Sequence, residues 1–166
     1  MGVKNYNQKT AWPWIFVSLF IIVCDQLTKY FILQHLTEQS VVHVFPFLNF
    51  ILRFNAGASF SFLGNASGWQ IYLLVGISAV VSVILISWLT RLPRNEWWTT
   101  LPISLVLGGA LGNLIDRVRF GYVTDFIDFY VGNWHFATFN VADSAVSVGA
   151  AWLVLIFLYE IYSGRH

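Results

Sequence analysis

Aspartates are the residues of this sequence whose positions suggest chemistry. The chain has 166 residues, of which only 10% are charged, and aspartate and glutamate together number eight. An ionisable side chain within a hydrocarbon layer is costly unless it is paired or hydrated, so carboxylates next to long apolar stretches indicate a site. Five aspartates have such positions: Asp25, Asp116, Asp125, Asp128 and Asp143.

Polar partners accompany these aspartates at helical spacing. Residues three or four positions apart share one face of a helix and can pair. Each cluster alone is explained equally well as a structural network, but three of them at the ends of apolar stretches favour a site over a scaffold. The clusters are Asp25 with Lys29, Asn113 with Asp116 and Arg117, and Asn140 with Asp143.

An aspartate pair is the simplest competent chemistry for these residues. A serine nucleophile needs a base, and the lysine nearest the polar layer, Lys29, already has Asp25 as its partner. Cys24 has no histidine in local relation, and His35, His43 and His135 are scattered without an HExxH pair, so we expect no metal and no cofactor.

Two carboxyls that share one proton can hydrolyse a peptide bond, because the ionised carboxylate activates water while the neutral carboxyl protonates the carbonyl oxygen. Spacing alone leaves Asp125 and Asp128 as competitors for one position of such a pair.

Four apolar stretches are long enough to cross a membrane and would position these residues. The chain is 57% hydrophobic and 18% aromatic, with mean hydropathy +0.66, and a span needs about 20 apolar residues. The first stretch lacks a small-x-small cleavage site, so we expect a retained span and not a signal peptide. The net charge of +1 gives no reason to expect a nucleic-acid partner. We expect one membrane domain, 1–166, with spans at 12–33, 69–89, 97–115 and 139–159.

The outer segments 34–68 and 116–138 contain candidate strands. Residues 41–54 are rich in β-branched and aromatic side chains, Pro46 suggests an edge or a break, and 134–139 could add a strand. The expected fold class is therefore an all-α integral membrane protein with four transmembrane helices and a small extramembrane β-sheet on the non-cytoplasmic side. Small residues at helical spacing in the third and fourth spans predict close approach of neighbouring helices: Gly108 with Gly112, and Ala145 with Gly149.

Basic residues set the expected orientation. Positive charge is enriched in cytoplasmic loops, and an even number of spans places both termini on one side. The expected cytoplasmic residues are Lys4, Lys9, Arg91, Arg94 and Arg165. The count is nearly balanced by Lys29, Arg53, Arg117 and Arg119 on the opposite side, but Lys29 and Arg117 have acidic neighbours and are assigned to a polar cluster. The aspartates then lie near the non-cytoplasmic surface.

Five motifs together resemble the bacterial lipoprotein signal peptidases, also called type II signal peptidases. They extend from the first span to the last in the family's order, and the departures are small: Ser59 stands where alanine is usual and Thr28 where serine is common. The motifs are DQLTK at 25–29, NAGASFS at 55–61, GNLIDR at 112–117, GYVTDF at 121–126 and FNVADS at 139–144.

The resemblance implies an aspartyl endopeptidase of the bacterial inner membrane that removes the signal peptide of prolipoproteins just before a diacylglyceryl-modified cysteine. It places the catalytic pair on Asp125 and Asp143. The partners it implies are lipid-modified prolipoproteins and membrane lipid, and we expect a monomer. The residues it assigns to support of the site or contact with substrate are Asp25, Lys29, Asn55, Gly57, Asn113, Asp116, Arg117 and Asn140.

Three other readings are weaker. A small transporter would bind cations or protons near the midplane of the membrane, whereas these aspartates are expected near one surface. A membrane scaffold explains the glycine and alanine faces but not five clustered aspartates. An intramembrane protease of the presenilin type would carry a GxGD motif, which the chain lacks.

Overall fold

Four long helices and one small sheet make up the computed structural model, which describes residues 10–57 and 68–164. The helices are α1 (Ile15–His35, preceded by the 3-10 turn η1, Trp12–Trp14), α2 (Trp69–Leu89), α3 (Trp97–Phe120) and α4 (Val141–Ser163). The strands are β1 (Val41–Phe45), β2 (Leu48–Asn55), β3 (Val123–Val131) and β4 (Trp134–His135). Each helix is long and apolar enough to cross a membrane.

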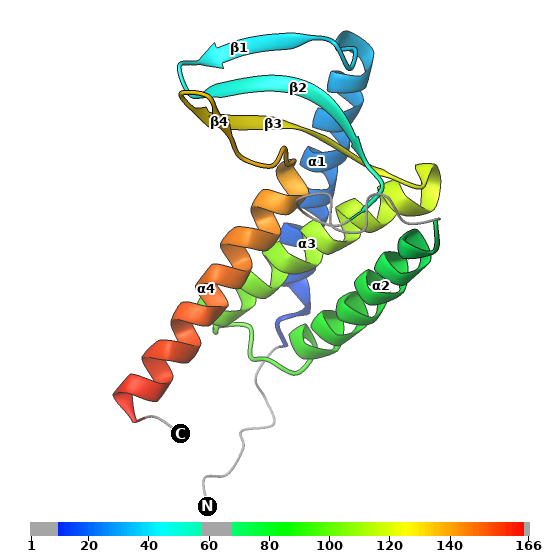
Figure 1. Cartoon of the computed structure of the whole chain (residues 1–166). Coiled ribbons are helices and arrows are strands. Elements are labelled where there is room, and N and C mark those ends of the chain that lie inside the picture. The colour runs from blue at the N-terminus through cyan, green and yellow to red at the C-terminus, as the bar shows by residue number, and fades with distance from the viewer. Residues whose placement is uncertain (1–9, 58–67, 165–166) are drawn as a thin grey trace, which may run out of the picture.

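Helix α3 is the centre of the bundle and packs against α1, α2 and α4 (Figure 1). Close approach depends on glycine: a Cβ at Gly108 would lie 2.8 Å from the Ser18 carbonyl oxygen of α1, and one at Gly149 would lie 2.7 Å from the Pro102 carbonyl oxygen of α3. The predicted small-residue faces therefore lie at helix contacts. Large apolar side chains of α1, α2 and α4 point outward, as contact with lipid requires.

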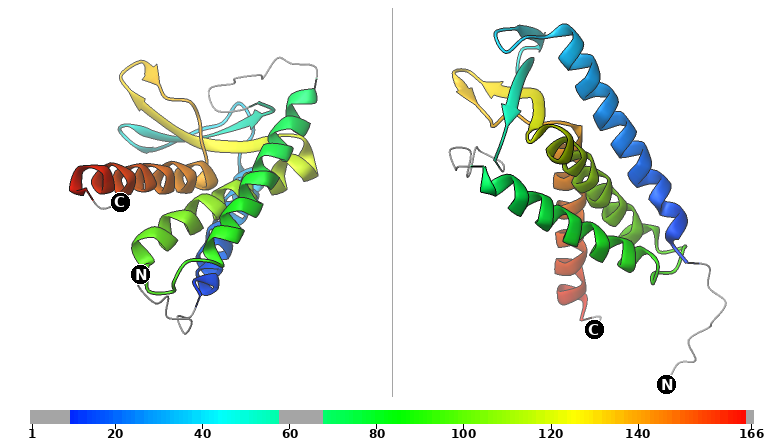
Figure 2. Two further views of the ribbon diagram at one scale, coloured as in Figure 1. Left: turned by 90° about the horizontal axis from the view of Figure 1, so that it is seen from below. Right: turned by 90° about the vertical axis from the view of Figure 1, so that its right-hand side faces the viewer.

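The sheet lies at one end of the helices, where α1 ends and α4 begins (Figures 1 and 2). Its strands are all antiparallel, in the order β1-β2-β3-β4. A small apolar core of Ile32, Leu52 and Phe126 attaches the sheet to the end of α1. The predicted fold class is confirmed: a helical membrane protein with a small sheet outside the spans.

Helix boundaries differ from the predicted spans where polar residues continue a helix beyond its apolar stretch. The third span was expected to end at 115, but α3 continues to Phe120 and ends where Gly121 adopts a left-handed conformation (φ 77°). The fourth was expected to begin at 139, but Phe139 pairs with Ile127 and Asn140 caps the helix. The first and fourth helices also extend past 33 and 159, to His35 and Ser163.

Strand prediction was partly wrong. The segment 41–54 forms two strands, with a turn at Pro46 and Phe47 between them. In 134–139 only Trp134 and His135 form a strand. The longest strand, β3, was not predicted at all, although it pairs with both β2 and β4.

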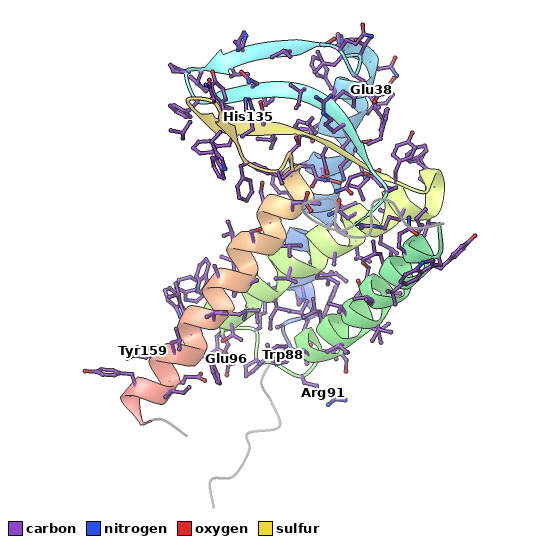
Figure 3. The ribbon with its side chains drawn as sticks, viewed as in Figure 1. Glu38, Trp88, Arg91, Glu96, His135 and Tyr159 are labelled. Atoms are coloured by element: carbon purple, nitrogen blue, oxygen red, sulfur yellow. The ribbon has the colours of Figure 1, made fainter. Side chains whose placement is uncertain are left out.

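The end of the molecule opposite the sheet carries the α2–α3 connection. Figure 3 shows Trp88, Arg91 and Glu96 at this end and His135 at the other. The backbone N–H of Ala11 donates to the carbonyl of Leu92 (2.9 Å), so the chain enters α1 beside this connection. Three residues used to predict the orientation, Lys4, Lys9 and Arg165, lie outside the described residues.

Candidate active site

The two carboxylates that the motifs select come from different elements and line the same cavity. Asp125 lies in β3 and is paired in register with Arg53 of β2, whereas Asp143 lies in the first turn of α4. The cavity has a volume of about 480 Å³, and Asn55, Arg117 and the segment 136–139 also line it. Two carboxylates therefore face a space large enough for several residues of a peptide.

Asn140 connects the two carboxylates. It is the N-cap of α4: its side-chain oxygen accepts from the backbone N–H of Asp143 (2.8 Å), and the Asp143 carboxylate accepts from the backbone N–H of Asn140 (3.3 Å). Its amide nitrogen donates to Asp125 Oδ1 (2.8 Å). A capping box normally satisfies only the end of a helix; here it also holds a carboxylate of the neighbouring strand.

A second amide, Asn113 of α3, holds Asp143 from the other side. Its nitrogen donates to Asp143 Oδ1 (2.7 Å), and its oxygen accepts from Lys29 Nζ (3.1 Å) and from Asn140 (3.2 Å). The Asn55 amide completes the set by donating to Asp125 Oδ2 (3.0 Å). Three amides thus fix the orientation of both carboxylates, and none of them brings a net charge into the cavity.

A buried ion cluster lies behind the amides. Lys29 Nζ is 2.8 Å from Asp25 Oδ2 and 2.9 Å from Asp116 Oδ2, and all three side chains are almost fully buried. The predicted Asp25–Lys29 pair is present. Asp25 Oδ1 also accepts from the backbone N–H of Ala142 (2.9 Å), so α1 holds the first turn of α4 through this carboxylate. A buried charge is retained when it is paired and hydrogen-bonded in this way.

Two contributors to the cluster were missed. Gln26 donates to Asp116 Oδ1 (2.8 Å), and the backbone N–H of Thr124 donates to Asp116 Oδ2 (3.3 Å). Gln26 lies inside the DQLTK motif beside Asp25, and Thr124 precedes Asp125. Adjacency to a motif aspartate was the available signal for both residues.

Arg117 lies at the cavity and not in the ion cluster. Its Nη2 donates to the carbonyl of Gly57 (3.1 Å), and the backbone N–H of Gly57 donates to Asn55 Oδ1 (3.0 Å). Its neighbour Asp116 points instead to Lys29. Residues 58–61 of the NAGASFS motif, which include Ser59, lie outside the described residues.

Asp128 is separated from Asp125 by the geometry of the strand. Side chains alternate between the two faces of a strand, so residues three apart point to opposite faces. Asp128 does not line the cavity; it accepts from Asn49 (2.9 Å) and His135 (2.8 Å) within the sheet. The ambiguity that spacing left open is thus resolved in position: Asp125 faces the cavity and Asp128 does not.

The environment of Asp125 favours its protonated form. Burial, followed by the nearby Asp143 carboxylate, raises the pKa of Asp125 from its ordinary value of 3.8 to about 7, although hydrogen bonds from Asn55 and Asn140 and the charge of Lys29 oppose the rise. At neutral pH this carboxyl is therefore present in both protonation states. A group with this pKa can act as an acid or a base under physiological conditions.

The described part of the chain offers little to a metal or a serine mechanism. Among the residues between 10 and 164 that the structure describes, no group of three or more histidine, cysteine or acidic side chains could hold a metal ion. Ser144 lines the cavity, but its hydroxyl donates to the carbonyl of Asn140 (2.9 Å), and Lys29 is enclosed between two carboxylates.

Comparison with known proteins shows which family the chain belongs to. Residues 17–159 match the family model described as signal peptidase (SPase) II. The chain is 54% identical over 152 residues to the lipoprotein signal peptidase of Coxiella burnetii (strain Dugway 5J108-111), with 92% of this chain and 93% of the relative covered. It is 49% identical over 142 residues to that of Acinetobacter baylyi (strain ATCC 33305 / BD413 / ADP1), covering 86% and 79%.

Two solved structures are similar to this chain over most of its length. A bacterial membrane enzyme determined by the in meso method matches with a TM-score of 0.83 and 30% sequence identity over 97% of both chains. A second such enzyme matches with a TM-score of 0.78 and 30% identity, over 88% of this chain and 92% of the other. With a family model that spans most of the sequence and relatives of this identity, the chain belongs to the signal peptidase II family.

Proposed function

We propose that Asp125 and Asp143 are the catalytic carboxylates of this membrane aspartic peptidase, which removes the signal peptide from prolipoproteins. The observation that carries the proposal is that both carboxylates line one cavity and are joined through Asn140. Such a pair needs neither metal nor covalent intermediate to hydrolyse a peptide bond, because one carboxyl serves as acid and the other as base.

The reactive form of the pair holds one proton. In this form Asp125, with a pKa of about 7, carries the proton, and Asp143 is ionised at the N-terminus of α4, where the helix dipole favours negative charge. Asp143 removes a proton from water as the water oxygen attacks the scissile carbonyl carbon. Asp125 donates its proton to the carbonyl oxygen, which gives a neutral gem-diol.

Collapse of the gem-diol restores the pair. Asp143 gives its proton to the leaving amide nitrogen as the carbon–nitrogen bond breaks. A hydroxyl of the gem-diol returns its proton to Asp125 as the new carboxylic acid forms. The amides of Asn113 and Asn140 keep the two carboxylates in place through both steps.

The substrate is a prolipoprotein cut immediately before a diacylglyceryl-modified cysteine. Acyl chains of such a residue stay in the bilayer and hold its scissile bond close to the membrane surface. The arrangement supports this assignment, because Asp125 lies in the sheet just beyond the spans and Asp143 lies in the first turn of a span.

The site faces the non-cytoplasmic side, and both termini are cytoplasmic. Support comes from Arg91 and Arg94, which lie in the α2–α3 connection, and from the hydrogen bond that ties Ala11 to the same connection. The sheet lies at the opposite end of the helices (Figure 1). Described residues of one chain supply both carboxylates and the amides that hold them, which supports an enzyme that acts as a monomer in contact with membrane lipid.

Purified protein should be incubated with a diacylglyceryl-modified precursor and with the same precursor unmodified. Cleavage of the lipidated form alone, mapped by mass spectrometry to the bond before the modified cysteine, is the expected result. Equal cleavage of both forms would contradict the substrate assignment, and cleavage of neither would contradict the function.

A further inference from the structure

A chain of polar side chains crosses all four strands of the sheet on the side away from the catalytic pair. His43 of β1 lies opposite Asn49 of β2, and Asn49 lies opposite Asp128 of β3. The His43 ring nitrogen Nδ1 is 2.8 Å from Asn49 Oδ1, and Asn49 Nδ2 is 2.9 Å from Asp128 Oδ2. From β4, His135 Nδ1 lies 2.8 Å from Asp128 Oδ1. These four residues are called the cross-strand chain below.

All donors of the cross-strand chain point toward Asp128. Asn49 uses its nitrogen toward the carboxylate, so its oxygen is the acceptor and His43 Nδ1 carries the hydrogen. His135 Nδ1 must likewise carry a hydrogen, because a carboxylate only accepts. The Asp128 side chain is 4% exposed, and a buried carboxylate of this kind depends on such partners. Asp128 is thus the acceptor on which the chain converges.

The cross-strand chain ends next to the cavity that Asp125 and Asp143 share. Residues 136–139 follow His135 directly and line this cavity; they are called the wall below. The wall is attached at both ends: the backbone N–H of Phe136 donates to the carbonyl of Phe129 (2.8 Å), and Phe139 pairs with Ile127. Residues 137 and 138 between these points belong to no strand.

Backbone pairing alone would hold the wall only weakly at the end that follows His135. Strand β4 has two residues, and pairing this short gives little stability by itself. The link from His135 to Asp128 adds a charge-assisted hydrogen bond to this end. Figure 3 shows His135 at the β4 side of the sheet.

We propose that Asp128 and His135 are positioning residues for the peptidase reaction: through their hydrogen bond they hold the wall 136–139 at the distance from the catalytic pair that a bound precursor requires. The inference rests on the proposed function, because it concerns how substrate is held in the same cavity. Neither residue touches the reacting atoms. Release of the wall should therefore weaken substrate binding and leave the chemical step nearly intact.

Kinetics of variants test the proposal. His135→Leu and Asp128→Ala should each raise KM for the lipidated precursor about fivefold to tenfold with kcat within about twofold of the parent. Asp128→Asn keeps an acceptor for His135 and should restore most of the affinity. The double variant should be no worse than the worse single variant, because both changes remove one link.

A control variant and hydrogen exchange distinguish a role of His135 in holding the wall from a general effect of losing a histidine. His35→Leu changes an exposed histidine at the end of α1, outside the sheet and the cavity, and should leave KM unchanged. Amide hydrogen exchange of 134–139 in detergent should become faster in His135→Leu and stay at the parental rate in His35→Leu. Faster exchange without a rise in KM, a fall in kcat equal to the rise in KM, or no change in either would overturn the proposal. An inactive parent would instead contradict the proposed function.

Discussion

The short side chain of Asn140 makes two hydrogen bonds with different roles. Its oxygen caps α4 through the backbone N–H of Asp143, and its nitrogen reaches Asp125 on β3. The same residue therefore determines where α4 begins and how far its first carboxylate lies from the strand. The Asn113 amide of α3 holds the same carboxylate of Asp143 from the other side. The cap of a helix, and not a dedicated loop, thus sets the position of Asp143 relative to Asp125.

Replacement of either catalytic carboxylate should abolish cleavage. Asp125→Asn and Asp143→Asn each remove the group that must accept and donate a proton, so turnover should fall at least about a thousandfold. Asp128→Asn is the matched control, because Asp128 lies on the same strand as Asp125 without lining the cavity, and it should keep substantial activity. The turnover of lipidated precursor by each purified variant measures these effects. Full turnover by Asp125→Asn, or loss in Asp128→Asn equal to that in Asp125→Asn, would show that the pair is wrongly assigned.

The pKa of Asp125 makes activity and stability depend on pH. It is raised from 3.8 to about 7, so between these values the folded protein binds a proton that the unfolded chain releases. The contribution of Asp125 therefore favours the folded state most at low pH, declines as pH rises through this window, and changes no further above about pH 7. Loss of the same proton removes the general acid, so kcat should decline above about pH 7.

Asp125→Asn removes the titrating group and isolates its effect. The melting temperature of the parent minus that of Asp125→Asn should fall between about pH 4 and pH 7, whatever the constant offset that the amide introduces. Thermal melts in one detergent at a series of pH values measure this difference. Parallel curves for the two proteins would mean that Asp125 titrates in its ordinary range.

Individual residues were predictable where they lay in motifs, and less so where the fold joins distant elements. The Asp25–Lys29 pair follows from helical spacing alone. The contact of Gln26 with Asp116 joins α1 to α3, and no local pattern states which helices are neighbours. Motif order supplied the remaining site residues, but not the partners that hold each of them.

At the scale of elements, the strand that carries Asp125 is the part that sequence reasoning missed. The sequence VTDFIDFYV is rich in β-branched and aromatic side chains, which favour a strand, but its two aspartates are unfavourable in a strand and it lacks a regular alternation. Both are tolerated because side-chain amides hold each of them: Asn55 and Asn140 at Asp125, Asn49 at Asp128. Helices were easier to predict, because a span must be long and apolar whatever its neighbours are.

Close packing of α3 and α4 predicts a site-dependent effect of one methyl group. A Cβ at Gly149 would lie 2.7 Å from both the Pro102 carbonyl oxygen and a methyl of Val106, whereas one at Gly76 of α2 has nothing within 4 Å. Alanine favours a helix over glycine by about 1 kcal/mol at either position. Gly76→Ala should therefore keep or raise the melting temperature, and Gly149→Ala should lower stability by about 1–3 kcal/mol through overpacking.

The overpacking expected in Gly149→Ala should lower peptidase activity as well as stability. Gly149 lies less than two turns from Asp143 on α4, so displacement of the helix moves a catalytic carboxylate. Gly149→Ala should thus lower kcat as well as the melting temperature, while Gly76→Ala should change neither activity nor oligomeric state. Equal melting temperatures for the two variants would show that α3 and α4 do not approach as closely as the glycine indicates.

At the scale of the whole molecule, the two ends of the helices differ in kind. One end bears the sheet, the proposed catalytic pair and the ion cluster; the other bears the basic α2–α3 connection beside the start of α1 (Figure 2). An enzyme whose substrate is anchored in lipid needs this polarity, because its catalytic groups must lie at the membrane surface from which the precursor is presented. Residues in the middle of the helices pack these helices against one another.

This polarity predicts the topology of the protein in the cell. In a Cys24→Ala background, a cysteine in place of the exposed Asn133, in the β3–β4 turn, should react with a membrane-impermeant maleimide added to intact spheroplasts. A cysteine in place of the exposed Asn95, in the α2–α3 connection, should react only after the membrane is opened, because the arginines beside it favour the cytoplasmic side. Each single-cysteine variant must still cleave lipidated precursor, which ensures that the labelled molecules are native. Labelling of Asn95→Cys from outside, with Asn133→Cys protected, would reverse the orientation and place the catalytic cavity on the side where prolipoproteins are made.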